Sequence, residues 1–161
     1  MDKLRLPPKL SHDQILTYND AIYRFNYISD SDQEQLVMVT MGNASRIIEK
    51  HTISLGAADH TLSNLKILLN RILVDKAEGF IIAHNHTSGR SAFSYDDLKL
   101  AAHLKLVSAM LDLDFMDSLV FPYQNQPVSM RQKHQKFWSH DYLLYLNKGI
   151  DKYITGKKWI V

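Results

Sequence analysis

Two histidines, one residue apart, follow a short apolar run near the middle of the chain. Residues 80–83 (Phe-Ile-Ile-Ala) have the composition of a buried strand, and His84 and His86 come directly after them. Because strand side chains alternate with a period of two, both imidazoles are expected on one face. The Thr-Ser-Gly that follows ends the strand. The pair is therefore placed like two ligands of a metal ion.

An aspartate is close enough in sequence to join them. Ten residues separate His86 from Asp97, which a loop and the first turn of a helix can span. Two imidazoles and one carboxylate supply the three protein ligands of a catalytic zinc site, whose fourth position is kept for water. Ser94-x-x-Asp97 is also the pattern of a capping box that opens a helix. The two interpretations are compatible, since a carboxylate has several acceptor sites, and Asp96 is expected to point elsewhere.

The whole pattern resembles the signature of the JAB/MPN (JAMM motif) metalloproteases, His-x-His followed by Ser-x-x-Asp. It is most similar to the RadC-like branch, whose motif is His-Asn-His-Pro-Ser-Gly, and weaker similarity extends from Glu34 to Met130. The resemblance implies a JAB/MPN, cytidine deaminase-like fold and a zinc-dependent hydrolase of peptide or isopeptide bonds, with a protein or peptide substrate. The residues that match in order and spacing are His84, Asn85, His86, Ser88, Gly89, Ser94 and Asp97.

Four departures from the family pattern stand out. Thr87 replaces the usual proline, and residues 90–93 replace a proline-rich segment. Asp117-Ser118 stands where the family often has Asp-His. The helix-hairpin-helix region that usually precedes the domain in full-length RadC proteins is not expected here. The first three departures leave all three candidate ligands in place, whereas the fourth means that DNA binding through a helix-hairpin-helix region is not expected.

The resemblance also implies a glutamate outside the metal sphere that acts as general base, and family position maps this role onto Glu34. Glu34 follows a polar run at the start of a strand. Glu49 lies within a strand, and Glu78 opens the strand that His84 ends, roughly 20 Å away at about 3.3 Å per residue. The alternative is that Glu34 is an exposed charge at a strand edge. In this scheme the hydroxyl of Ser94 stabilises the tetrahedral oxyanion.

Composition indicates one ordinary globular domain. The chain has 161 residues, of which 45% are hydrophobic and 22% charged. It contains no cysteine, so every metal ligand must be nitrogen or oxygen. No apolar run approaches the roughly 18 residues that span a membrane, and the N-terminus has no apolar core of a secretion signal. We therefore expect a cytoplasmic protein without membrane contact.

Charge is distributed unevenly. Residues 1–130 hold 12 Lys and Arg against 15 Asp and Glu, whereas residues 131–161 hold 7 against 2. A basic end on an acidic body is typical of a weak contact with nucleic acid or an acidic partner. The alternative is a solvated helix face.

Hydrophobic periodicity predicts an α/β fold, a mixed sheet flanked by helices. An N-terminal helical segment (1–30) contains a helix capped by Ser11 that runs to Phe25. The RadC-like domain (31–130) and a basic, aromatic C-terminal helical extension (131–161) follow. The aromatic stripe of the extension packs onto the core or forms a homodimer contact. The expected strands are 35–41, 46–56, 79–84, 115–121 and 128–130, and the expected helices are 61–75, 95–111 and 134–154.

Two other functions remain open at this point. One is a protein of DNA repair, recombination or mobile elements that binds or acts on DNA. Two-metal phosphodiester chemistry would need more carboxylates at the site than Asp96 and Asp97. The other is a non-catalytic metal-binding scaffold, and the intact His84, His86 and Asp97 argue against it.

Overall fold

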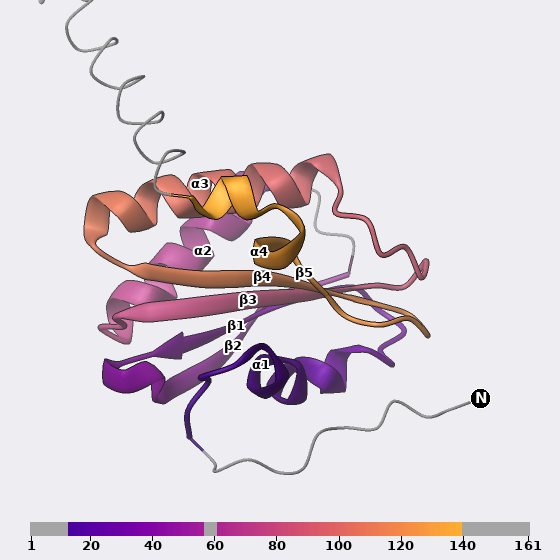
Figure 1. The fold of residues 1–161 in the computed structure, drawn as a ribbon, viewed down its shortest axis with the longest axis horizontal. Coiled ribbons are helices and arrows are strands. Elements are labelled where there is room, and N and C mark those ends of the chain that lie inside the picture. The colour runs from indigo at the N-terminus through magenta and orange to yellow at the C-terminus, as the bar shows by residue number, and fades with distance from the viewer. Residues whose placement is uncertain (1–12, 57–60, 140–161) are drawn as a thin grey trace, which may run out of the picture.

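A mixed sheet of five strands forms the centre of the computed structural model, which describes residues 13–56 and 61–139 (Figure 1). The strands lie in the order β2-β1-β3-β4-β5, and only β3 and β4 run parallel to each other. The α/β architecture predicted from the sequence is therefore confirmed. The strands are β1 (Gln35–Met41), β2 (Ile47–Leu55), β3 (Gly79–His86), β4 (Asp114–Pro122) and β5 (Val128–Ser129).

Helices cover both faces of this sheet. In Figure 1, α2 (Thr61–Val74) and α3 (Tyr95–Leu111) lie on one face and α1 (Tyr18–Phe25) on the other. Because strand side chains alternate, the central strands contribute to two apolar clusters. Leu36 and Ile82 belong to the cluster that includes residues of α2 and α3. Val37 and Ile81 belong to the cluster that includes residues of α1.

The predicted N-terminal helix is wrong in its start. It was expected from a cap at Ser11, which lies outside the described residues, but α1 begins at Tyr18 behind the N-cap Thr17. The side chains of Thr17 and Asp20 form a reciprocal capping box, which fixes the helix start there. Residues 13–16 are not helical: Gln14 forms an isolated antiparallel bridge with Arg46, and Ile15 donates its N–H to the carbonyl of Ser45 at 3.0 Å.

The predicted C-terminal elements are correct only in part. Residue 130 was expected in a strand, but it opens the short helix α4 (Met130–Lys133). His134 leaves the helical conformation with φ −121° and ψ 54°, so no continuous helix starts at this residue, and the 3-10 helix η3 (Gln135–Trp138) follows. Trp138 packs against the α2 and α3 cluster. The rest of the predicted helix, and most of the basic extension, lies in residues 140–161, outside the described part of the chain.

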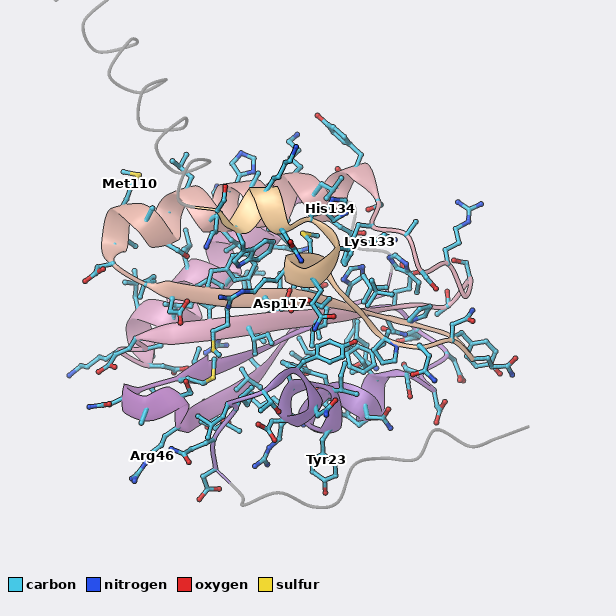
Figure 2. All side chains as sticks on the ribbon, in the orientation of Figure 1. Tyr23, Arg46, Met110, Asp117, Lys133 and His134 are labelled. Carbon is cyan, nitrogen blue, oxygen red and sulfur yellow. The ribbon has the colours of Figure 1, made fainter. Side chains whose placement is uncertain are left out.

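Asp117 of β4 ties the last elements to the sheet (Figure 2). Its carboxylate accepts from the hydroxyl of Ser129 and from the backbone N–H groups of Ser118 (2.7 Å) and Arg131 (2.9 Å). Burial raises the pKa of Asp117, and these hydrogen bonds oppose that shift. The carboxylate therefore fixes β5 and α4 against β4.

A second, partly buried carboxylate connects α2 to the β1–β2 hairpin. Asp75 follows α2 and accepts from Thr40 Oγ1 at 2.5 Å and from His51 Nε2 at 2.6 Å. The side chains of His51 and Asp75 are 12% and 11% exposed, so the pair is largely shielded from water. Burial alone raises the pKa of Asp75, but the hydrogen bonds from Thr40 and His51 and the nearby charges lower it overall.

The remaining predicted elements agree closely with the structure. Residues 35–41 and 95–111 have the observed bounds of β1 and α3, and β1 and β2 pair as an antiparallel hairpin through the turn at η2 (Asn43–Ser45). Another short 3-10 helix, η1 (Asn26–Ile28), follows α1. Among the helices that the structure describes, none has both the length and the apolar character needed to cross a bilayer.

Candidate metal centre

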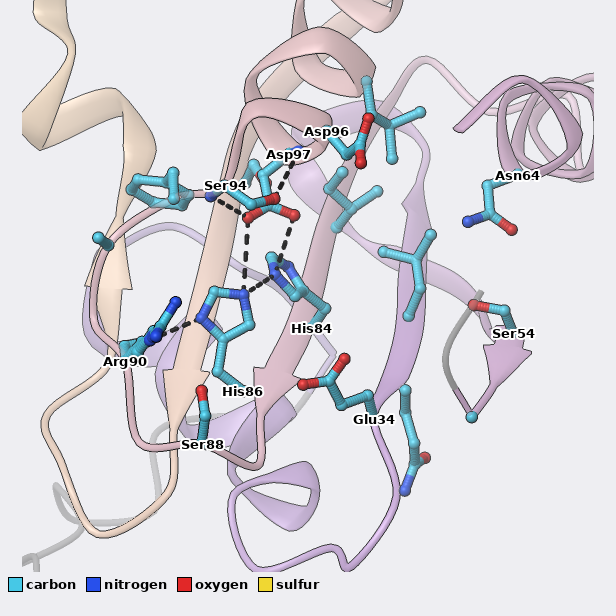
Figure 3. Close-up of a pocket in the computed structure, with 18 residues that line it drawn as sticks. Glu34, Ser54, Asn64, His84, His86, Ser88, Arg90, Ser94, Asp96 and Asp97 are labelled. Atoms are coloured by element: carbon cyan, nitrogen blue, oxygen red, sulfur yellow. Dashed lines mark hydrogen bonds and ion pairs between the residues drawn. The ribbon is translucent and has the colours of Figure 1, made fainter. Parts of the chain in front are cut away.

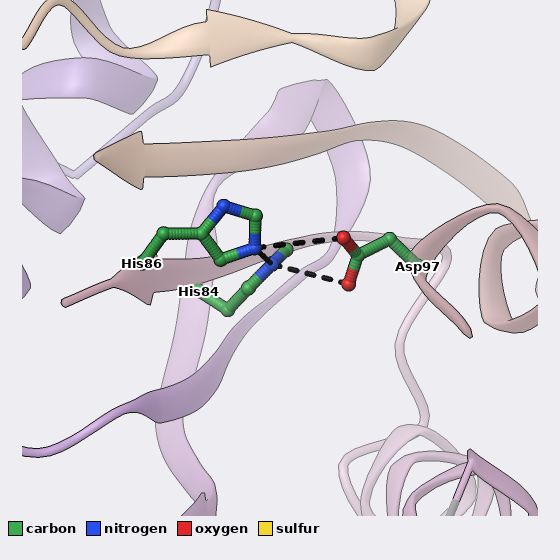
Figure 4. A group of neighbouring side chains, drawn as sticks. All are labelled: His84, His86 and Asp97. Atoms are coloured by element: carbon green, nitrogen blue, oxygen red, sulfur yellow. Dashed lines mark hydrogen bonds and ion pairs between the residues drawn. The ribbon is translucent and has the colours of Figure 1, made fainter. Parts of the chain in front are cut away.

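The two histidines lie at the end of the central strand β3. Its first five residues are buried, as the apolar run predicts, and His84 and His86 then emerge with side chains 15% and 13% exposed. The strand was expected to end at His84, but it continues to His86, which still pairs with Pro122 of β4. The histidines therefore share one face, and their Nε2 atoms lie 2.8 Å apart (Figure 4).

Asp97 reaches the same point from the first turn of α3. Its Oδ1 lies 3.1 Å from Nε2 of His84 and its Oδ2 lies 3.6 Å from Nε2 of His86. Oδ2 also accepts the backbone N–H of Ser94 at 2.6 Å, and Ser94 Oγ accepts the N–H of Asp97 at 3.1 Å. The capping box and the metal-site geometry coexist, as the sequence predicted, because the cap holds the carboxylate over the histidines (Figure 3).

The other ring nitrogen of His86 defines which tautomer is present. Nδ1 lies 2.7 Å from the backbone carbonyl oxygen of Arg90. A carbonyl oxygen can only accept, so Nδ1 carries the hydrogen, and the neutral ring has its lone pair on Nε2. The lone pair of Nε2 therefore points toward His84 and Asp97, where it can bind a metal ion. The Arg90 carbonyl fixes this orientation of the ring.

The charges of the cluster reinforce one another. The carboxylate of Asp97 beside the ring raises the pKa of His86, although burial opposes this shift. Burial by itself raises the pKa of Asp97, but the adjacent imidazoles of His84 and His86 outweigh it and hold that pKa well below its usual range. Asp97 is therefore an ionised carboxylate at any ordinary pH, as a metal ligand must be.

The donor atoms fit a tetrahedral metal ion. Zinc bonds of about 2.0–2.2 Å at tetrahedral angles place two donor atoms about 3.3–3.6 Å apart. The imidazole nitrogens lie 2.8 Å apart, and they lie 3.1 Å and 3.6 Å from the two oxygens of Asp97, so the donor atoms are within a few tenths of an ångström of that range. Within the described part of the chain, His84, His86 and Asp97 are also the one group of three such side chains close enough to share an ion. The cluster can thus hold a metal with small movements of its side chains.

Glu34 lies in the same cleft without belonging to the cluster. It is half-buried just before β1 and lines a cavity of about 450 Å³ together with His84 and His86. Its Oε1 lies 3.4 Å from the hydroxyl of Thr87, and Figure 3 shows its side chain directed toward the two histidines. The structure therefore brings Glu34 beside the candidate metal ligands rather than leaving it as an isolated edge charge.

The other two glutamates lie at the far end of the strands. Glu49 is exposed and pairs with Thr40, near the end of β1, whereas His84 pairs with Leu36 near its start. Glu78 donates its N–H to the carbonyl of Met41, at that same far end. Glu49 and Glu78 therefore lie at the opposite end of the sheet from the cleft.

Three of the other polar residues that line the cleft bear on the predictions from the sequence. Ser94 is exposed there and uses an oxygen lone pair for the helix cap, which leaves its hydroxyl hydrogen able to donate to a bound group. Asp96 also lines the cleft, but it is not among the three side chains that lie close enough together to share an ion. Ser118, from the Asp117-Ser118 pair, is 2% exposed and faces the cleft, whereas Asp117 is not among the lining residues.

Two contributors were not identified from the sequence as parts of the site. The carbonyl of Arg90 orients His86, but a backbone atom leaves no signal in residue types. Asn85 is 1% exposed between the two histidines and bonds to the segment that carries Glu34. Its amide side chain at a buried strand position was the available signal, since buried amides need partners.

Comparison with known proteins agrees with this geometry. The sequence model of the RadC-like JAB domain family matches residues 16–136, which include β1, all three candidate ligands, Glu34 and Ser94. The match also includes α1, so it begins within the segment that was expected to precede the domain.

Relatives from archaea and bacteria share the same region. A UPF0758 protein of Methanospirillum hungatei is 27% identical over 109 residues, which cover 66% of this chain and 48% of that protein. A UPF0758 protein of Clostridium perfringens is 28% identical over 101 residues, with 63% and 44% covered. One from Streptococcus uberis is 28% identical over 131 residues, with 80% and 58% covered. The chain thus spans about half the length of the curated relatives it matches.

Proposed function

The chain belongs to the RadC-like JAB domain family, and on that premise we propose that it is a zinc-dependent hydrolase of peptide or isopeptide bonds. His84 and His86 would hold the ion through Nε2, and Asp97 through its carboxylate. A zinc ion bound there would lower the pKa of its bound water and, as a Lewis acid, would polarise the substrate carbonyl.

The observation that carries the proposal is the position of Glu34 beside the three ligands. A scaffold that only binds metal needs the ligand cluster but does not need a carboxylate directed toward it from another strand, as Glu34 is (Figure 3). Glu34 lines the cleft with His84 and His86, and its Oε1 contacts Thr87 rather than a ligand. A general base needs this arrangement, with a carboxylate near the reacting water but outside the metal sphere.

Each residue then has a distinct task in amide hydrolysis. Glu34 takes a proton from the attacking water and passes it to the leaving amine. Ser94 donates its hydroxyl hydrogen to the carbonyl oxygen as negative charge develops there, while its lone pair stays bonded to the N–H of Asp97. Asp97 and the Arg90 carbonyl hold the imidazoles of His84 and His86 in the orientation needed to bind the ion.

The test is cleavage by protein purified without a polyhistidine tag. Zinc-loaded and chelator-treated protein would be incubated with libraries of peptide-linked and lysine isopeptide-linked substrates, and with DNA as a separate arm. Asp97→Ala is the inactive variant, and Asp114→Ala, an exposed carboxylate of β4, is its matched control. Elemental analysis for zinc, iron and manganese would accompany each preparation.

We expect amide cleavage that depends on zinc, disappears with Asp97→Ala and persists with Asp114→Ala. A fully zinc-loaded protein that cleaves no amide substrate would favour the metal-binding scaffold. Cleavage of DNA alone would favour the nucleic acid alternative.

A further inference from the structure

Asn85 lies between the two histidines but points its side chain into the protein. It is 1% exposed, and its amide bonds the chain segment that leads into β1. Oδ1 accepts the backbone N–H of Gln35 at 2.7 Å, and Nδ2 donates to the carbonyl of Gln33 at 3.0 Å and more weakly to that of Ser31 at 3.4 Å. Gln33 and Gln35 are the two chain neighbours of Glu34, so one side chain holds the backbone on both sides of Glu34.

These bonds continue the sheet where its backbone ladder stops. The antiparallel pairing of β1 with β3 ends at Leu36 opposite His84. The same register, continued, places Gln35 opposite Asn85 and Glu34 opposite His86. Along residues 33–35, hydrogen bonds from the side chain of Asn85 take the place of backbone hydrogen bonds between the strands. On the other edge, the N–H of Gly56 donates to the carbonyl of Glu34 at 2.8 Å.

The same register explains why Glu34 faces the candidate metal ligands. Side chains two residues apart along a strand share a face, so Glu34 has the side of Leu36, and His86 that of His84. That orientation depends on the position of the backbone at Glu34, which the bonds of Asn85 to Gln33 and Gln35 hold next to β3. An asparagine suits this role because its amide offers both an acceptor for an N–H and donors for carbonyl groups.

We propose that Asn85 is a positioning residue that holds Glu34 in reach of the attacking water. The inference rests on the proposed function, since it assigns Asn85 to the general base of that reaction. Asn85 touches neither substrate nor metal in this scheme. It acts through the backbone of Glu34 alone, so its loss should change catalysis without changing metal binding.

The test compares Asn85→Ala and Asn85→Asp with the same changes at Asn70, an exposed residue of α2. Asn85→Ala removes every bond, whereas Asn85→Asp keeps the acceptor for Gln35 and loses the donor to Gln33. Hydrogen exchange should therefore accelerate at the Gln35 amide in Asn85→Ala but not in Asn85→Asp. Zinc content should equal that of wild type in both, and melting temperatures would confirm that each variant is folded. If Asn85→Ala does not fold, Asn85→Asp carries the kinetic test alone.

The kinetic result separates positioning from general damage. We expect kcat to fall about 10- to 100-fold in both Asn85 variants with KM nearly unchanged, since a small misplacement of a catalytic group costs this much. In a Glu34→Gln background, the Asn85 changes should lower kcat no further, because the group they position is already inactive. The Asn70 variants should match wild type throughout.

Two results would overturn the inference. One is an unchanged exchange rate at Gln35 in Asn85→Ala. The other is an equal loss of kcat in the wild-type and Glu34→Gln backgrounds, which would mean a general structural defect. Absence of turnover in wild type would instead contradict the proposed function, and the exchange rates would still decide whether Asn85 holds the Glu34 segment.

Discussion

Nε2 of His84 faces Nε2 of His86 at 2.8 Å, and the Arg90 carbonyl keeps the hydrogen of His86 on the opposite ring nitrogen. Two imidazole nitrogens at this distance lie close enough to bind one metal ion together. With the ionised Asp97 beside them, they form a site whose lone pairs converge on one point. Removal of either imidazole should therefore lower the metal content of the protein.

His84→Ala should reduce bound zinc from about one ion per chain to a small fraction, because the two ligands that remain are too few to hold the ion. The control is His103→Ala, on the same helix as Asp97, where Nδ1 bonds the carbonyl of Lys99 at 2.9 Å. Elemental analysis of untagged protein measures both. Zinc at the wild-type ratio in His84→Ala would remove this residue from the ligand set.

Ser94 has two predicted roles that different substitutions separate. Ser94→Ala removes the helix cap and should cost roughly 0.5–2 kcal/mol of stability, whereas Ser94→Gly should cost only a few tenths. Both remove the hydroxyl, so turnover should fall by about 10²–10³ in each. Thr17→Ala is the control, because it removes the corresponding cap of α1 away from the cleft. Unchanged turnover in Ser94→Gly would leave Ser94 as a helix cap alone.

Asp75 predicts a dependence of stability on pH. Its folded-state pKa is lowered, so its ionised form stabilises the fold above the unfolded-state pKa, and that contribution is lost as the pH falls through the folded-state value. Asp75→Asn should therefore reduce the free energy of unfolding at neutral pH by roughly 1–3 kcal/mol. The gap between variant and wild type should narrow below about pH 4.

Urea unfolding at neutral and acidic pH measures this gap. Asp32→Asn, which changes an exposed carboxylate in the loop before β1, is the control and should follow wild type at both values. A gap for Asp75→Asn that stays constant with pH would show that the loss comes from packing rather than from the charge.

The local parts of the site could be predicted from the sequence. The period of a strand placed His84 and His86 on one face, and the Ser94-x-x-Asp97 pattern located the start of α3. Both signals are carried by residues close together in the chain, which is why they can be recognised without the fold. The roles of Glu34 and Ser94 in catalysis stay predictions.

The parts that depend on distant contacts could not be predicted. Asn85 finds its partner Gln35 at a separation of 50 residues, so its role becomes visible only once β1 and β3 are paired. At the N-terminus, two capping signals compete, and pairing of the segment at Ile15 with the β1–β2 turn accompanies the start at Thr17. At Asn85 the tertiary hydrogen bond decides the structure, whereas at the N-terminus it acts together with the local capping box of Thr17 and Asp20.

Glu34→Gln tests the central claim of metal-dependent hydrolysis most directly. Glutamine keeps nearly the same shape and can bond a water molecule, but it cannot take its proton. The matched control is Glu49→Gln, in β2, where Glu49 pairs with Thr40 near the end of β1 that lies away from the cleft. His86→Ala serves as the comparison in which metal and activity should disappear together.

The measurement is zinc content and turnover on the same preparations, with any substrate found in the cleavage screen. We predict that Glu34→Gln retains zinc at the wild-type ratio while turnover falls by about 10²–10⁴, and that Glu49→Gln matches wild type in both. Cleavage by Glu34→Gln at the wild-type rate would contradict the account, because the carboxylate beside the metal cluster would then not be the general base.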